Sequence, residues 1–521
     1  MLVYGDHADE ADPREVIADV SARVRRGDRE NARIEAGRLV QGLLDAEQAA
    51  AGADDLTPLA ESCARALADL DVRALQRLAL PSRVTMKLPE GYAFYAVYPE
   101  LYTAAARRAP AGLRPIGIRS IGTSLAAVLP GGERALSVRP TGHPFERRLE
   151  LGPRLRSELG RDRSYAIVDE GPGLSGSSFA AVAEVLLERG VAPGDIHLFP
   201  SHGNGPGARA SERTRSLWQQ LPKHVASFEE VLLPELPGWV ADLTGPPIAP
   251  LQDLSGGAWR DGIFTADSRP PCNLQQERRK YLLRTERGAF LLKFAGLGAA
   301  GEAVLRRAQT IAGAGFAAEV LGLRRGFLVQ RWIDARMADV SVDEVASYIA
   351  FRSRALPAGD RTGAPPARLL EMAEHNSGFT LERFRDRIDD LARDMIRVET
   401  DNKLHAWEWL RAPDGRLFKT DGADHCRGHD LVGCMDPAWD LAGASFELGL
   451  DQEALWRRFR EHGGRGAKPE VLAFLRPCYL AFQLGAHVLA AASNPGERAG
   501  LERAAERYRL LLREELRSVH R

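Results

Sequence analysis

Cysteine, excess charge of one sign and long apolar runs are all scarce in this sequence. Its 521 residues include five cysteines, far apart and without C-x-x-C spacing, which argues against a zinc site or a disulfide framework. The formal net charge of −1 at pH 7 gives no bulk attraction to nucleic acid or to an anionic membrane. No run approaches the roughly 18 apolar residues that a membrane span needs, and MLVYGDHADEADP is too acidic for a signal peptide. We therefore expect a cytoplasmic protein with reduced thiols that binds neither nucleic acid nor membrane.

The composition is that of a soluble globular protein with more than one core. Hydrophobic residues make up 44% of the chain and charged residues 27%. A chain of 521 residues is too long for a single hydrophobic core, so two or three domains are expected. Helical spacing at the start and a segment rich in Pro and Gly near the middle suggest the boundaries. We expect a helical lead-in at 1–82, a first domain at 83–235, a linker at 236–258 and a second domain at 259–521.

The stretch YAIVDEGPGLSGSS, Tyr165 to Ser178, combines an apolar strand, two acids and a loop of small residues that opens a helix. Unpaired N–H groups at a helix start bind anions, so this loop is suited to a phosphate. The two acids, Asp169 and Glu170, are suited to ribose hydroxyls or to their Mg²⁺. The stretch resembles the motif with which type I phosphoribosyltransferases bind PRPP. The resemblance implies a PRPP site formed by these acids together with Leu174, Ser175, Gly176, Ser177 and Ser178.

Two further segments are suited to phosphate and lie upstream of that motif. In LRPIGIRSIGTSLAAVL a strand is followed by a small polar loop, where the resembled family binds pyrophosphate. The resemblance implies that the pyrophosphate-binding residues are Arg119, Ser120, Gly122 and Thr123. The basic segment LSVRPTGHPFERRL stands where such transferases carry a mobile flap, which makes Arg139 and His143 candidate catalytic residues. A solvated hairpin is the alternative interpretation of that segment.

Strands and helices alternate between residues 83 and 235. The expected strands include YAFYAVY, PIGIRSI, YAIVDE and DIHLFPS, and AAVAEVLLERG is an expected helix. This alternation predicts a parallel sheet covered by helices, and sites in such sheets lie at the carboxyl ends of strands. All three phosphate-suited loops would lie at that edge.

The second half begins with a predicted hairpin, ERRKYLLRTERGAFLLKFAGLG, that carries one lysine in an apolar strand. Burying an ammonium group is costly unless an anion meets it, so Lys293 needs an acidic partner. Glu302, at the start of the next helical run, is the nearest candidate. A strand lysine paired with a helix glutamate is how protein kinases orient nucleotide phosphates. The alternative is a lysine that extends from an edge strand into water.

A second predicted hairpin lies in DNKLHAWEWLRAPDGRLFKTDGADH, around the turn Pro413-Asp414-Gly415. This segment and the later MDPAWDLAGA resemble the aminoglycoside phosphotransferase and choline kinase-like family, which has the protein kinase-like fold. The resemblance implies ATP binding by Lys293 and Glu302, metal binding by Glu408 and Asp421, and Asp401 as the catalytic acid. The sequence departs from the family because Glu408 replaces an asparagine, Asp401 lies seven residues before it where five is usual, and a Gly-rich nucleotide loop is missing.

The acids and histidines that follow this hairpin allow two interpretations. They are Asp421, Asp424, His425, His429 and Asp430. One interpretation is a metal site. The other, which we favour from sequence, is a polar loop whose histidines bond to neighbouring residues.

The sequence as a whole predicts an α/β parallel-sheet phosphoribosyltransferase-like domain followed by an α+β two-lobed kinase-like domain. We expect a bifunctional, Mg²⁺-dependent transferase that uses PRPP or a ribose phosphate, ATP and an unidentified small-molecule acceptor. One alternative is a nucleotide- or PRPP-sensing protein with a catalytically silent kinase-like scaffold. In another, only the kinase-like half is active. The acceptors and the oligomeric state do not follow from the sequence.

Overall fold

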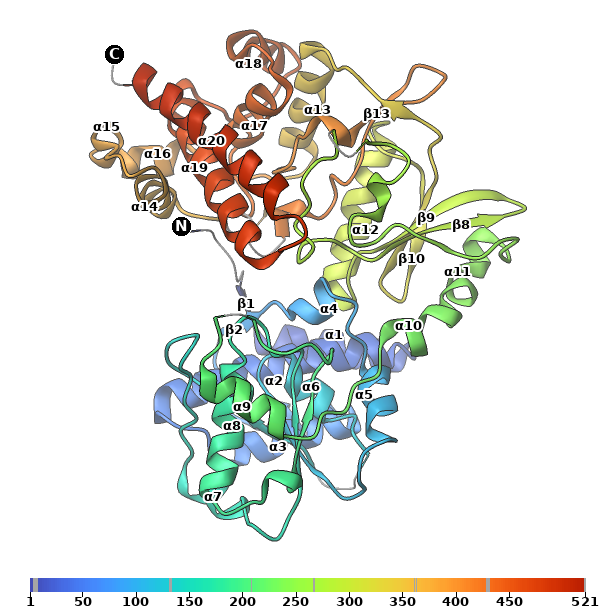
Figure 1. The fold of residues 1–521 in the computed structure, drawn as a ribbon, viewed down its shortest axis with the longest axis vertical. Helices are drawn as coiled ribbons and strands as arrows, with labels where there is room; N and C mark the ends of the chain where they lie inside the picture. Colours follow the sequence, from blue (N-terminus) through green and yellow to red (C-terminus); the bar gives the residue numbers. More distant parts are fainter. Residues whose placement is uncertain are drawn as a thin grey trace. The chain divides into compact units, whose positions relative to one another are not determined.

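The protein folds into two compact units in the computed structural model (Figure 1). The structure describes residues 1–2, 8–130, 134–207, 209–265, 268–359, 361, 363–427 and 432–519. The N-terminal unit comprises Ala8–Trp239 and Gly296–Ala300. The C-terminal unit comprises Met1–His7, Val240–Ala295 and Gly301–Arg521. Each unit has its own sheet and its own hydrophobic core, and each is described by itself.

A four-stranded parallel sheet forms the centre of the N-terminal unit. Its order is β4-β3-β5-β6, with β3 Arg114–Ile118, β4 Leu136–Val138, β5 Tyr165–Val168 and β6 Ile196–Phe199. Every residue of β5 and β6 is buried, as expected for parallel strands with both faces covered. The register pairs Ile116 with Ile167 and Ile167 with Leu198, so apolar side chains run across the sheet. The predicted parallel sheet is confirmed.

The strand order places the ends of β3 and β5 side by side. From β3 the chain crosses to β4 on one side, and from β5 it crosses to β6 on the other. Such a reversal opens a crevice at the carboxyl ends of the two central strands, where ligands of open α/β sheets bind. The loops that begin at Arg119 and Asp169 both start at this edge.

The N-terminal unit also contains helices and a short antiparallel ribbon. A two-stranded ribbon pairs β1 Ala8–Ala11 with β2 Val84–Lys87. The segment YAFYAVY, residues 92–98, was expected as a strand. Its first two residues instead end the short helix α4 Glu90–Ala93, which begins after Pro89, and the rest is turn and irregular chain. The helices are α1 Pro13–Arg25, α2 Arg29–Ala51, α3 Pro58–Asp69, α4 Glu90–Ala93, α5 Pro99–Ala106, α6 Ile121–Ala126, α7 Pro153–Glu158, α8 Ser177–Glu188, α9 Glu212–Gln220 and α10 Phe228–Val231.

The segment expected as a linker at 236–258 has regular structure. Helix α11 spans Leu236–Thr244. Strand β7 spans Gln252–Asp253 and pairs with β8, Lys280–Thr285, in the C-terminal unit. The division between the two units falls within α11, between Trp239 and Val240.

An antiparallel five-stranded sheet opens the C-terminal unit, in the order β10-β11-β9-β8-β7. Strands β8 Lys280–Thr285 and β9 Gly288–Phe294 form the predicted hairpin, joined by Glu286 and Arg287. The remaining strands are β10 Val320–Arg324 and β11 Phe327–Arg331. Helix α12, Gly298–Gly313, connects β9 to β10. Lys293 lies on the central strand β9, opposite Leu328 of β11.

The rest of the C-terminal unit is mostly helical, and a small sheet lies within it. That sheet joins β12 Arg336–Met337, β13 Trp409–Arg411 and β14 Leu417–Lys419, so the second predicted hairpin is confirmed. The main core contains the fully buried Trp409 and Trp439. The helices are α13 Val342–Ala355, α14 Pro366–Ser377, α15 Glu382–Arg385, α16 Ile388–Asp394, α17 Ala438–Leu448, α18 Gln452–Glu461, α19 Pro469–Ser493 and α20 Arg498–Val519. A sheet followed by helices agrees with the predicted α+β class.

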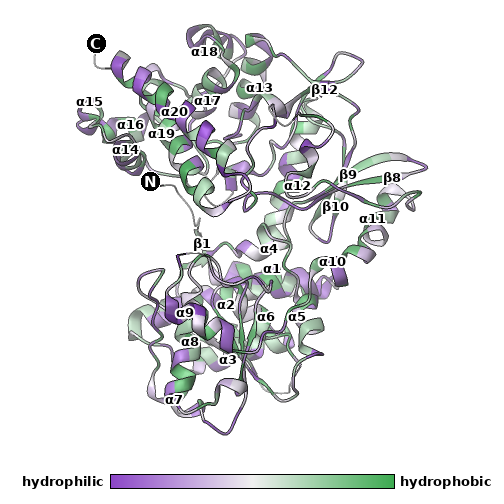
Figure 2. Cartoon of the chain, in the orientation of Figure 1, coloured by the Kyte–Doolittle hydropathy of each residue, from purple (hydrophilic) through white to green (hydrophobic). Residues whose placement is uncertain are grey.

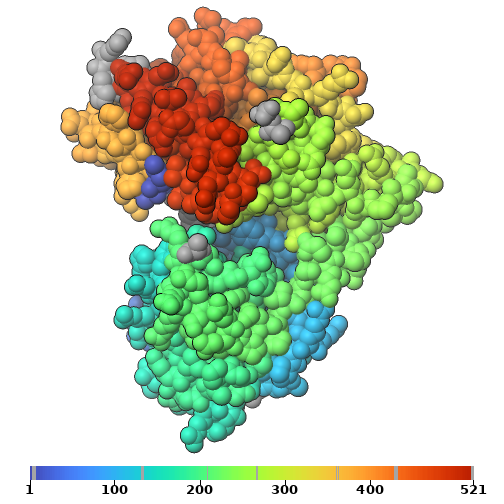
Figure 3. All heavy atoms as spheres, viewed as in Figure 1, coloured from blue at the N-terminus to red at the C-terminus, as the bar shows by residue number. Residues whose placement is uncertain are grey.

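Helix α19 is long and apolar enough to meet the length and composition of a membrane span, which the sequence analysis did not expect. Of its most apolar window, 72% is buried inside the fold, and it packs along α20 and against α14 and α17. Helix α20 packs on α19 and carries both hydrophilic (purple) and hydrophobic (green) residues in Figure 2. Figure 3 shows the red C-terminal segment on the visible surface of its unit. Helix α19 is therefore a core helix of this unit.

Candidate functional site

Lys293 of β9 points at two acids that follow β14. Its Nζ forms an ion pair with Asp421 and lies 3.2 Å from Asp424 Oδ1. Burial lowers the pKa of Lys293 to about 8, an effect that Asp424 opposes. Asp424 also lies 3.4 Å from Arg278 Nε, so two cations and two carboxylates meet here. The sequence predicted an acidic partner for Lys293, and the structure supplies two of them from a distant segment.

A second buried lysine holds the other predicted metal-binding residue. Lys419, the last residue of β14, has its Nζ 2.5 Å from Glu408 Oε2 and 3.4 Å from Asp401. Glu408 ends the short helical turn Ala406–Glu408 that leads into β13. The hairpin register sets Trp409 opposite Lys419, so Glu408 and Lys419 meet at its open end. Glu408, Asp421 and Asp424 are thereby gathered around two lysines.

Asp401, the predicted catalytic acid, has no exposed surface. Its carboxylate accepts a hydrogen bond from the Tyr348 hydroxyl and lies 3.7 Å from Arg352 Nη1. Burial by itself would raise its pKa, but the Lys419 ammonium and a hydrogen bond from His425 hold the pKa of Asp401 below its usual range. All of these partners belong to the protein, so the Asp401 carboxylate serves first as an internal anchor.

The side chain of Asp440 holds the loop that carries Asp401 through hydrogen bonds to its backbone. One carboxylate accepts the backbone N–H of Asp401 at 2.8 Å and that of Asn402 at 2.9 Å. Burial raises the pKa of Asp440 to about 6. Asp440 lies in the Asp-Pro…Asp-Leu-Ala segment that the sequence analysis singled out. Its observed role is to fix the backbone at residues 401 and 402.

His425 is the third member of a group that can hold a metal ion. One ligand atom each from Glu408, Asp421 and His425 lies within 4.8 Å of the others. His425 Nδ1 is 3.1 Å from the Asp401 carbonyl oxygen, and His425 Nε2 is 3.7 Å from Asp421 Oδ2. Burial lowers the pKa of His425, which favours the neutral ring. His429 and Asp430, named with it in the sequence analysis, lie outside the described residues.

Glu302, predicted to orient Lys293, lies in the first part of α12 and is half-buried. The ion pairs of Lys293 described above are those with Asp421 and Asp424. A pairing of Glu302 with Lys293 stays a prediction.

In the N-terminal unit, Asp169 and Glu170 follow β5 directly, as predicted. Burial raises the pKa of Asp169 to about 7 and that of Glu170 to about 8. Glu170 accepts the backbone N–H of Gly91 at 2.8 Å, and the Tyr102 hydroxyl donates to the Asp169 carbonyl oxygen at 2.8 Å. Both residues are half-buried at the edge of the sheet.

Arg119 and Arg139 are bound inside the unit. The Arg119 guanidinium, with 1% of its side chain exposed, pairs with Asp45 at 2.8 Å and also with Asp54. Arg139 Nη2 lies 2.6 Å from Asp45, and its Nη1 donates to the Arg119 carbonyl oxygen at 2.6 Å. The two arginines fix the loop after β3 to helix α2. Gly122 and Thr123 lie in α6, and the Thr123 hydroxyl is buried 2.8 Å from Ser137 Oγ, so Ser120 and the backbone of this segment are its remaining ligand candidates.

The serine loop meets the basic segment. Ser175 Oγ and Ser177 Oγ each donate to the Pro144 carbonyl oxygen at 2.7 Å. Gly176 has a left-handed backbone with φ 65°, and its N–H bonds to Pro172 at 2.7 Å. The side chains of Leu174 and His143 are exposed. The loop and the segment predicted to cover it are thus in contact. The Pro144 carbonyl oxygen accepts hydrogen bonds from the Ser175 and Ser177 hydroxyls, which a bound phosphate would need as donors.

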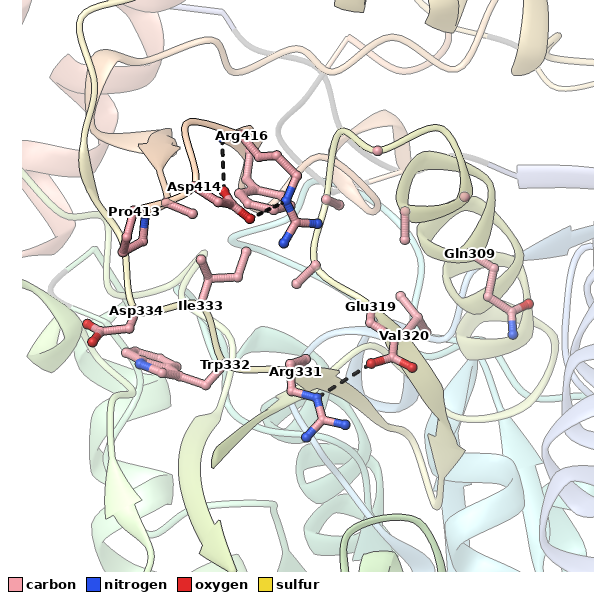
Figure 4. A pocket seen from close by; sticks show the side chains of 17 residues that line it. Gln309, Glu319, Val320, Arg331, Trp332, Ile333, Asp334, Pro413, Asp414 and Arg416 are labelled. Atoms are coloured by element: carbon pink, nitrogen blue, oxygen red, sulfur yellow. Dashed lines mark hydrogen bonds and ion pairs between the residues drawn. The ribbon is translucent and has the colours of Figure 1, made fainter. Parts of the chain in front are cut away.

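A separate pocket of about 720 Å³ lies in the C-terminal unit, beside the end of α12 (Figure 4). Trp332 and Ile333 line it together with two ion pairs, Arg331 with Glu319 at 3.5 Å and Arg416 with Asp414 at 2.7 Å. Figure 4 shows these pairs at opposite sides of the hollow. The residues predicted from sequence to form a site do not line it.

Sequence reasoning missed the groups that hold the site residues in place. Lys419, Tyr348 and Arg352 surround Asp401, and Asp45 and Asp54 bind Arg119. Lys419 offered a signal, because it is a lysine within an apolar hairpin strand like Lys293. The others lie in helices or loops far along the chain and offered none.

No protein-family model matches the sequence, and no curated protein matches it. Among solved structures, choline kinase LicA from Streptococcus pneumoniae is 14% identical, with a TM-score of 0.33 over 54% of this chain and 98% of that one. A macrolide 2'-phosphotransferase type I is 15% identical, with a TM-score of 0.34 over 53% and 96% of the two chains. A glucosamine kinase is 17% identical, with a TM-score of 0.32 over 54% and 84%. Each of these proteins is similar to about half of this chain.

Proposed function

We propose that the protein is a two-site transferase. In this proposal the C-terminal unit transfers the γ-phosphoryl group of ATP to a small-molecule hydroxyl, and the N-terminal unit binds PRPP or a ribose phosphate. The observation that carries the proposal is the convergence of Lys293 on Asp421 and Asp424, next to Glu408. A buried lysine among carboxylates at the end of a hairpin suits a polyphosphate and its divalent ion.

Each residue of the C-terminal site has a chemical role in the proposal. Lys293 binds the nucleotide phosphates, with Glu302 to orient it, and keeps Asp424 as a partner. Glu408 and Asp421 supply the oxygen ligands that a hard divalent cation such as Mg²⁺ prefers. A Mg²⁺ ion held by these two residues would supply positive charge to the phosphoryl group during its transfer. Asp401 acts as a positioning residue, because its carboxylate holds Lys419, Tyr348 and Arg352 together.

The N-terminal site rests on the neighbouring loops after β3 and β5. Asp169 and Glu170 take the ribose hydroxyls or their Mg²⁺, and the backbone from Ser175 to Ser178 takes the 5′-phosphate. Pyrophosphate lies against Ser120, Gly122 and Thr123, while Arg119 and Arg139 hold that loop in place. Ser175 and Ser177 become available to phosphate when the Pro144 carbonyl moves away.

Calorimetric titration of the full chain with ATP and Mg²⁺ tests the first site. We expect binding that falls at least tenfold in Asp421→Asn and in Lys293→Ala. Lys468→Ala is the matched control, since Lys468 is exposed and pairs with Asp394 away from the site. Phosphorylated product from a panel of small amino alcohols and sugars then reports transfer. Absence of ATP binding by the wild-type chain would refute the proposal for this unit.

Titration with PRPP and Mg²⁺ tests the second site independently. Binding that is lost in Asp169→Asn and kept in Glu188→Gln, on the exposed end of α8, supports it. A titration in which the wild-type protein binds neither PRPP nor ribose 5-phosphate would contradict it.

A nucleotide- or PRPP-sensing protein is the second candidate. The full burial of Asp401 favours it, because a general base must reach the hydroxyl that it deprotonates. ATP or PRPP binding without phosphorylated product or pyrophosphate release would select this function.

A further inference from the structure

Three ligand atoms, from Glu408, Asp421 and His425, form a compact triangle in the C-terminal unit, all within 4.8 Å of one another. Bonds of about 2.0–2.2 Å to one ion allow its ligands to stand up to about 4.4 Å apart. The three side chains therefore need only small rotations to share an ion. They come from separate places: Glu408 from the turn before β13, Asp421 from the second position after β14, and His425 from the short helix His425–Arg427.

The hydrogen bonds of His425 determine which ring nitrogen is available. Nδ1 faces two acceptors, the carbonyl oxygen of Asp401 at 3.1 Å and its Oδ1 at 3.3 Å. A nitrogen between two acceptors carries the proton, so Nε2 of the neutral ring has a lone pair. That lone pair faces Asp421 Oδ2, another acceptor, at 3.7 Å. Two acceptors that face each other in this way are suited to a bridging cation, and a metal-binding histidine usually donates its other N–H to a carboxylate or carbonyl.

The lysines that now touch the two acids have other partners. Lys293 also reaches Asp424 at 3.2 and 3.3 Å, and Lys419 reaches Asp401 and the Thr420 carbonyl oxygen, the latter at 2.8 Å. Lys293 can therefore release Asp421, and Lys419 can release Glu408, while each ammonium keeps another carboxylate as its partner. Within the described part of the chain, the charged groups near the triangle include these two lysines, Asp401, Asp424, Lys403 and Arg278, whose Nε lies 3.4 Å from Asp424.

We propose that His425 is the third protein ligand of the divalent ion at Glu408 and Asp421, and that its nitrogen lets the site bind first-row transition ions more tightly than the two carboxylates alone would. This inference rests on the proposed metal site of the C-terminal unit. It adds a ligand and a metal class to that site. Mg²⁺ prefers oxygen ligands, whereas an imidazole nitrogen suits ions such as Co²⁺ and Zn²⁺.

Metal titration of the EDTA-treated full chain, without nucleotide, tests the proposal. We expect Co²⁺ to bind with visible d–d absorption, and His425→Ala to weaken Co²⁺ binding at least tenfold while Mg²⁺ binding changes less than twofold. His462→Ala is the matched control, because His462 pairs with Asp343 in another part of the unit. With Cu²⁺ as the probe, the nitrogen hyperfine splitting in the electron paramagnetic resonance spectrum should be present in wild type and absent in His425→Ala. His425→Gln, measured with a thermal melt, serves as the variant if His425→Ala does not fold.

The outcomes separate this inference from the proposed function. Equal Co²⁺ affinity in wild type and His425→Ala, with no nitrogen splitting, overturns the role of His425 and leaves a carboxylate Mg²⁺ site intact. Failure of both Mg²⁺ and Co²⁺ to bind, alone or with ATP, overturns the metal site and the inference together.

Discussion

Asp401 shows how the surroundings of one residue decide its role. It is an acid in the segment where the sequence predicts a catalytic one, yet it is fully buried and touches Lys419, Arg352 and Tyr348. Removal of its charge would take a buried carboxylate away from Arg352 and would leave Lys419 with Glu408 as its carboxylate partner. Breaking a buried ion pair in this way is strongly destabilising.

We expect Asp401→Asn to lower the free energy of unfolding of the C-terminal unit by about 3–5 kcal/mol. Chemical denaturation monitored by circular dichroism measures it. Asp414→Asn, in the exposed hairpin turn, is the control and should change little. Unchanged stability of Asp401→Asn would show that the carboxylate is not an anchor.

Asp169 and Glu170 make the stability of the N-terminal unit depend on pH. Their pKa values in the folded protein are raised to about 7 and about 8, while unfolded carboxyl groups titrate near about 4. Between these values the folded state binds more protons than the unfolded state, so stability falls as pH rises from about 4 to about 8. The Asp169→Asn, Glu170→Gln double variant should lose most of this decline.

Thermal melts at pH 5 and pH 8 measure the effect. The wild type should lose more stability than the double variant between these two pH values, and Glu188→Gln should behave as wild type. A double variant with the same decline as wild type would mean that neither acid has a raised pKa.

At the scale of elements, two glycines allow β3 and its following helix to pack closely. A Cβ on Gly122 of α6 would lie 2.2 Å from the Val168 carbonyl oxygen of β5. A Cβ on Gly117 of β3 would lie 2.4 Å from the Gly122 carbonyl oxygen. The close approach holds the loop after β3 against the end of β5, which is the edge where the ribose phosphate is proposed to bind.

We expect Gly122→Ala to destabilise the N-terminal unit by about 1–3 kcal/mol, since the backbone atoms it meets cannot move away cheaply. Gly160→Ala is the matched control, because a Cβ there meets nothing within 4 Å. Equal denaturation midpoints for the two variants would contradict the packing argument.

The hairpins were predictable because their signals are local. The turn Pro413-Asp414-Gly415 and the alternation around Glu286 and Arg287 define β13–β14 and β8–β9 within about 20 residues. The prediction of a strand at YAFYAVY was wrong. Its aromatic residues are buried in the last turn of α4 and the irregular chain after it, and burial of aromatic side chains does not by itself specify a strand.

The chain is divided into two compact units, and each proposed site belongs to one of them. The Asp169 site lies in the N-terminal unit and the Lys293 site in the C-terminal unit. We expect Asp421→Asn to leave PRPP affinity within twofold of wild type, and Asp169→Asn to leave ATP affinity within twofold. Calorimetric titration of both variants with both ligands measures this independence, and a tenfold cross-effect would show that the sites are coupled.

The order of strands and loops along the chain was enough to determine the parallel sheet, the two hairpins and the position of Asp169 and Glu170 at a strand end. These features depend on side-chain periodicity and on turn chemistry, which act over short distances. Only the tertiary structure decided that Lys293 meets Asp421 and Asp424, that Arg119 is bound to Asp45 and Asp54, and that Asp401 is buried. Such pairings join residues separated by dozens to more than a hundred positions, and packing of the whole unit selects which charges share the same small volume.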